Sequence, residues 1–69
     1  MNTNQGLSDA DIEARMAAAA SAHAAGRHRD ATHLYDQLAR DIQRSRGQFD
    51  PHALDAFEAV ARVIASLGK

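Results

Sequence analysis

Cysteine and tryptophan are absent from the sequence of 69 residues, which contains a single proline and three aromatic residues. Without cysteine the chain can form neither disulfides nor thiolate metal sites. The core of so short a chain is marginal, because only about 60% of the surface of the unfolded chain can be buried at this size. Small domains without disulfides often gain stability by oligomerisation.

Strong charge of one sign and long apolar runs are also missing. The formal net charge is −1, whereas nucleic-acid-binding domains normally carry a basic excess. No apolar run approaches the roughly 20 residues of a membrane-spanning helix, and residues 1–6 lack the basic and apolar regions of a signal peptide. We therefore expect a cytoplasmic protein that binds neither nucleic acid nor membranes. Seven of the eight basic residues are arginine, which together with abundant alanine is typical of a GC-rich bacterial genome.

Start and stop signals place the first helix over residues 8–25. Ser8 is a good N-cap, and Asp11 has the spacing of the second member of a capping box. The body is rich in alanine, which has the highest helix propensity, and Gly26 can end the helix in the left-handed conformation. One side of this helix is smooth and would let a neighbouring helix approach closely. That side consists of Ala14, Ala18, Ala22 and Ala25.

The second and third helices are predicted over residues 28–46 and 51–67. Apolar residues recur on the second helix at intervals of three and four and form one stripe. The stripe consists of Ala31, Leu34, Tyr35, Leu38 and Ile42. The third helix begins with Asp50 as an N-cap and Pro51 at the first helical position, where the missing N–H costs nothing. A glycine follows each of the two helices.

No segment shows the strict alternation of apolar and polar residues that marks a strand. The sequence therefore predicts an all-α fold of three antiparallel helices, with residues 8–69 as one domain and residues 1–7 as a disordered tail. The basic cluster at the end of the second helix consists of Arg40, Arg44 and Arg46. Cations stabilise helix C-termini, so we interpret this cluster as a solvated helix end rather than a phosphate or acidic-peptide contact.

Two parts of the chain resemble each other. Residues 12–27 can be aligned with residues 54–69 with four identical positions, and the alignment pairs Gly26 with Gly68, 42 positions later. Self-similarity at a fixed period of this order is the signature of stacked helical repeats.

The turn after the first helix, residues 24–35, resembles the turn between the helices of a tetratricopeptide repeat. That family has glycine at the turn, alanine five residues later at the tightest helix contact, and an aromatic residue four beyond it, here Gly26, Ala31 and Tyr35. Residues 47–54 resemble the second turn of the longer variety of this repeat, found in kinesin light chain and in many bacterial regulatory proteins. The resemblance covers residues 10–69 and implies one complete repeat plus the first helix of a second. Arg15 stands where the family has a large aromatic residue, which marks the first helix as an atypical capping element.

The resemblance also implies a site, because the family binds peptides with exposed faces of the first helix of each repeat. The corresponding groove residues here are Glu13, Met16, Ala20 and His23 from the first helix and Asp55, Glu58, Arg62 and Ser66 from the third. The carboxylates among them would favour a peptide with at least one basic residue.

The sequence contains few groups suited to catalysis. His23, His28 and His33 are spaced by five, which spreads them around a helix, whereas helical zinc sites use pairs three or four residues apart. No serine has a positioned histidine and acid partner, and no glycine-rich phosphate loop is present. We therefore expect no enzymatic activity, no bound metal and no cofactor.

The third helix has more apolar surface than one neighbour can cover. One arc consists of Leu54, Phe57, Ala61 and Ile64. Three further residues widen it to about half the circumference and are the predicted oligomer interface, namely Val60, Val63 and Leu67. A helix covering one neighbour needs a stripe only slightly more than about 100° wide, so we expect a second copy or a partner protein to cover the excess. The alternative is a compact bundle in which the third helix is sandwiched between the other two.

These observations predict a non-catalytic protein–protein interaction module of tetratricopeptide type that self-associates through its third helix and binds another protein or a peptide. The alternative is a small regulatory or accessory subunit, antitoxin-like or enzyme-associated, that masks a partner protein. An enzyme is the least favoured class.

Overall fold

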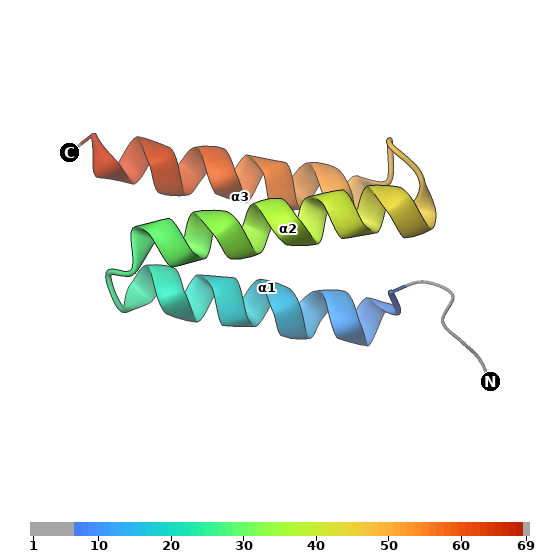
Figure 1. Cartoon of the computed structure of the whole chain (residues 1–69), viewed down its shortest axis with the longest axis horizontal. Coiled ribbons are helices and arrows are strands. Elements are labelled where there is room, and N and C mark those ends of the chain that lie inside the picture. The colour runs from blue at the N-terminus through green and yellow to red at the C-terminus, as the bar shows by residue number, and fades with distance from the viewer. Residues whose placement is uncertain (1–6, 69) are drawn as a thin grey trace.

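The computed structural model describes residues 7–68. Its three helices are α1 (Asp9–Ala24), α2 (His28–Arg46) and α3 (Pro51–Leu67). They lie side by side with α2 in the middle, and the chain reverses direction at each turn, so neighbouring helices run antiparallel (Figure 1). Residues 7–68 contain no strand, and the predicted all-α fold is confirmed. The predicted tail falls largely on residues 1–6, which lie outside the described residues, as does Lys69.

The helices begin and end close to the predicted positions. Ser8 Oγ accepts a hydrogen bond from the Asp11 amide at 3.1 Å, and the Asp11 carboxylate accepts one from the Ser8 amide at 3.2 Å, which completes the predicted capping box. Gly26 has a φ of 83°, the left-handed conformation that favours glycine at this position. Gly68, by contrast, has a φ of −76°. The two glycines aligned in the sequence therefore end their helices in different conformations.

The core is built from bulky residues of α2 packed against alanines. Leu38 and Ile42 are 0% exposed and share a cluster with Ile12 of α1. Alanine lets helix backbones approach closely because little side-chain volume separates them. The buried alanines are Ala19, Ala22, Ala31, Ala39, Ala53, Ala56 and Ala59. Five of these alanines lie on the outer helices α1 and α3, where they accommodate the large residues of the central helix.

For α1 and α2, the prediction from the sequence was wrong for some of the residues that face the core. The exposed alanines of the predicted smooth side are Ala14, Ala18 and Ala25. Ile12 and Met16 are the bulky residues of α1 that reach the core, and Ala19, seven positions after Ile12, lies on the same buried side. Leu34 of α2 is 39% exposed although it belongs to the predicted apolar stripe. Leu7, the last residue of the predicted tail, packs against the core.

α3 packs chiefly on α2 and meets α1 at only a few positions. The sandwiched arrangement, in which α3 would contact both other helices along its length, is therefore not the one observed. Because α2 alone covers most of α3, one side of α3 has no helix packed against it within residues 7–68.

Arg46, predicted as part of a solvated helix end, instead ties the start of the domain to the end of α2. Its guanidinium donates to the carbonyl of Leu7 at 2.9 and 3.2 Å and to the carboxylate of Asp9 at 2.8 Å. The side chain is 25% exposed. These hydrogen bonds join Arg46 to two residues that lie 37 and 39 positions earlier in the chain.

We expect Arg46→Ala to lower the free energy of unfolding by about 1–2 kcal/mol, because charge-assisted hydrogen bonds to the Leu7 carbonyl are lost. The control is Arg44→Ala, since Arg44 is 73% exposed and forms only an ion pair with Asp41. That change should cost less than about 0.5 kcal/mol. Equal losses for the two variants in urea unfolding would contradict a structural role for Arg46.

Asp50 caps α3 as predicted. Its carboxylate accepts a hydrogen bond from the His52 amide at 2.8 Å, and His52 Nδ1 lies 3.0 Å from the same oxygen. The backbone hydrogen bond, followed by the contact with the His52 side chain, lowers the pKa of Asp50 from its ordinary value of 3.8. A carboxyl group whose pKa is lower in the folded state than in the unfolded state stabilises the fold at pH values above its unfolded pKa. This stabilisation is lost as the pH falls through the folded-state pKa.

Asp50→Asn should therefore reduce stability well above pH 3.8 and make little difference well below it. Asparagine keeps the N-cap acceptor but cannot ionise. The measurement is the urea midpoint of wild type and variant as a function of pH. A difference between them that stays constant through the acidic range would show that the charge of Asp50 contributes nothing.

Candidate functional site

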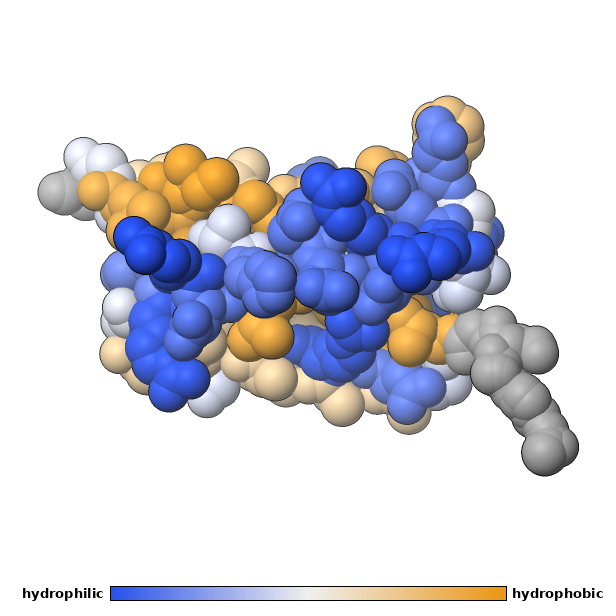
Figure 2. Space-filling view, in the orientation of Figure 1, coloured by the Kyte–Doolittle hydropathy of each residue, from blue (hydrophilic) through white to orange (hydrophobic). Residues whose placement is uncertain are grey.

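Exposed apolar residues are distributed along α3 from its first turn to its last. Leu54, Ile64 and Leu67 are 49%, 54% and 58% exposed. Phe57 is partly buried with part of its side chain packed against the core, and Ala61 is exposed. We call these five residues the α3 strip. Apolar colour gathers over the C-terminal half of α3, at the upper left of the space-filling view (Figure 2).

The α3 strip differs from the interface that the sequence predicted. Val63 is 1% exposed and belongs to the core, and Val60 is partly buried, so Leu67 is the one predicted interface residue that is exposed. The reason is the orientation of α3. Its small residues face the bulky side chains of α2, and this rotation leaves the larger Leu54 and Ile64 outside.

An open hollow adjoins the strip between the N-terminal half of α2 and the C-terminal half of α3. Its apolar lining comes from Val60, Ile64 and Leu67, and its polar lining from the turn and first turns of α2, including Arg29 and His33. The strip thus continues into a concave surface at the C-terminal end of α3.

The rim of the hollow has a positive character. Its acidic residues are already paired: Asp30 with Arg27 at 3.2 Å, and Asp36 with Arg40 at 2.9 Å. Arg29 has no ion pair within residues 7–68. The N-terminal end of the α2 dipole adds to this positive potential.

The structure brings only part of the predicted peptide groove together. His23 of α1 and Ser66 of α3 are in contact, with Nε2 and Oγ 3.2 Å apart. Met16 is partly buried and packs against both core clusters, so it fills the core instead of lining a groove. The remaining predicted residues are exposed: Glu13, Ala20, Asp55, Glu58 and Arg62.

The hydrogen bonds around Ser66 determine what His23 can do. Ser66 Oγ donates to the Val63 carbonyl at 2.7 Å, so its single proton is committed there. His23 Nε2 must then be the donor to Ser66 Oγ. A histidine that activates a serine has to accept the hydroxyl proton, which is the reverse of this arrangement. The contact joins the ends of α1 and α3.

His28, at the start of α2, also contacts His23. The His23 and His28 rings meet edge to face with centroids 5.3 Å apart, and Nδ1 of His28 is buried without a hydrogen-bond partner. Within residues 7–68, no three His, Cys, Asp or Glu side chains are placed to hold a metal ion. In the same part of the chain, no helix is long and apolar enough to cross a membrane.

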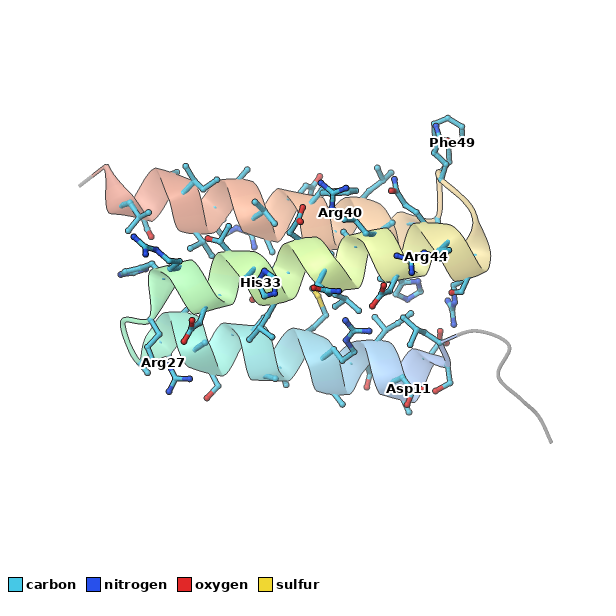
Figure 3. The ribbon with its side chains drawn as sticks, viewed as in Figure 1. Asp11, Arg27, His33, Arg40, Arg44 and Phe49 are labelled. Carbon is cyan, nitrogen blue, oxygen red and sulfur yellow. The ribbon has the colours of Figure 1, made fainter. Side chains whose placement is uncertain are left out.

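Sequence reasoning assigned no role to Phe49, the most exposed large apolar residue at 80%. It projects from the loop between α2 and α3, past the outer side of α3 (Figure 3). A signal was present in the sequence: Phe49 lies between a glycine stop and a helix cap, where no helical periodicity can turn it toward the core.

Comparison of the chain with models of protein families, with curated proteins and with solved structures finds no match.

Proposed function

We propose that this protein is a non-catalytic protein–protein interaction module of tetratricopeptide type that self-associates through the α3 strip. The observation that supports this most directly is the exposure of Leu54, Ile64 and Leu67 along one helix. Single exposed apolar residues are normal, whereas a contiguous apolar patch marks a site of interaction.

The energetics favour covering the strip. Fully burying a leucine or isoleucine side chain contributes about 1.5–3 kcal/mol relative to leaving it exposed. Two copies of the strip would bury such residues from both chains, and a domain of this size has little other stabilisation to draw on. The arginine- and alanine-rich composition supports a bacterial source, and we propose a cytoplasmic setting for this assembly.

Two features of the first turn support the tetratricopeptide type. Ala31, five residues after Gly26, is 0% exposed, as expected where two helices approach most closely. Tyr35, four residues further along, is 7% exposed and packs in the same cluster. The third helix then lies antiparallel to the second, as the first helix of a following repeat would.

A second candidate is a small regulatory or accessory subunit that masks a different protein. The positive rim of the hollow, with Arg29 unpaired within residues 7–68, favours an acidic partner at that end of the strip. A masking subunit would be poorly stable or monomeric alone, whereas the proposed module folds and self-associates without a partner.

Ile64→Asn should convert an oligomer into a folded monomer, because asparagine places an amide in the centre of the apolar contact. The control is Leu34→Asn, which alters a residue of α2 that is 39% exposed and lies outside the strip and the hollow. Light scattering after size-exclusion chromatography gives the mass of each variant. If wild type and both variants share one mass, the α3 strip is not the contact surface.

A further inference from the structure

We propose that a second copy of the chain docks antiparallel on the α3 strip, so that the N-terminal half of each α3 covers the C-terminal half of the other. This inference rests on the proposed self-association and specifies its geometry. Two independent properties of the exposed surface indicate it: the spacing of the strip and the position of Phe49.

The spacing of the strip is that of a two-helix seam. Leu54, Phe57, Ala61 and Ile64 follow one another at intervals of three, four and three residues, which is the a and d pattern of a coiled coil. In an antiparallel pair, Leu54 faces Ile64 of the other copy, and Phe57 faces Ala61. The large Phe57 then meets the small Ala61, which favours close packing. A parallel pair would place Phe57 on Phe57 and Ala61 on Ala61, which crowds one level and leaves a void at the other.

The same register would also cover the exposed side chain of Phe49. It lies two residues before Pro51 and projects past the outer side of α3 (Figure 3). When Leu54 faces Ile64 of the other copy, the loop that contains Phe49 comes level with Leu67 and the hollow beside it. The two most exposed large apolar residues, at 80% and 58%, are thereby covered together. In a parallel pair, Phe49 and Leu67 would lie at opposite ends of the seam.

The partner is a second copy, because the apolar register of the strip matches this chain's own sequence reversed.

Disulfide trapping tests this geometry without interference, because the natural chain has no cysteine. Leu54→Cys and Ile64→Cys change exposed positions, and circular dichroism verifies that both variants keep their helices. After mixing under oxidising conditions, we expect a disulfide-linked dimer that contains one chain of each variant. Neither variant alone should form a covalent dimer.

Three other outcomes would overturn the proposal. Covalent dimers formed by each variant with itself would show parallel helices, and the proposed self-association would stand. A dimer in solution that is not trapped in the mixture would place the contact outside this register. A monomer at all concentrations would overturn the self-association as well, so the two failures are distinguishable.

Discussion

Leu38→Ala is expected to lower the free energy of unfolding by about 2–5 kcal/mol. Leu38 is 0% exposed and is one of the largest fully buried side chains. It packs with Ile12 and Ile42 where all three helices meet. Truncation removes buried methyl groups and leaves a cavity that neighbouring alanines cannot fill. The native stability of so small a domain is itself about 3–10 kcal/mol, so much of the variant should be unfolded.

The matched control is Leu34→Ala, the same chemical change four residues earlier on α2 at a side chain that is 39% exposed. It should cost less than about 1 kcal/mol. Both variants are to be unfolded in urea at one fixed protein concentration, because self-association stabilises the folded state by mass action. If Leu34→Ala proves as damaging as Leu38→Ala, the assignment of the core-facing side of α2 is wrong.

Ala31→Leu is expected to destabilise the domain by about 1–3 kcal/mol through overpacking. Ala31 is 0% exposed and packs with Ala19 and Ala22 of α1 and with Tyr35. No room for three further carbon atoms exists at this position unless α1 and α2 move apart, and their separation would weaken the rest of the cluster.

The same substitution at Ala24 provides the comparison, because Ala24 is exposed at the end of α1. Leucine is also a strong helix former, so Ala24→Leu should be nearly neutral. Urea unfolding of the two variants gives the difference directly. Equal effects at both positions would refute the close approach of α1 and α2 at Ala31, and with it the resemblance of this turn to a tetratricopeptide repeat.

The positions of the helices could be predicted because their signals are local. The Ser8 capping box, the left-handed Gly26 and the Asp50-Pro51 start each depend on residues within a few positions of one another. The choice of buried side on α2 was also largely correct, since Leu38, Ile42 and Tyr35 outweigh the polar residues opposite them.

The rotation of α3 could not be predicted in the same way. This helix is apolar over about half its circumference, so periodicity alone does not say which part faces the core. The sequence analysis placed Val63 in the oligomer interface, whereas the structure buries it in the core together with Ala53 and Ala56. The deciding factor is the volume of the facing side chains on α2, which is a property of the packed pair and not of either helix.

Long-range polar contacts were missed for a related reason. Arg46 and Leu7 are 39 positions apart, and nothing in the sequence near either residue indicates the other. Arg15 of α1 forms an ion pair with Asp41 of α2 at 3.0 Å. Such pairings follow from the register of two packed helices, which is known only once the helices are placed.

Sedimentation equilibrium of the unmodified protein over a range of concentrations tests the central claim, self-association through the α3 strip, most directly. We expect a homodimer or a higher oligomer at micromolar concentration, which Ile64→Asn converts to a monomer while Leu34→Asn does not. A single species with the mass of one chain up to about a millimolar, where only very weak association would escape detection, would contradict it.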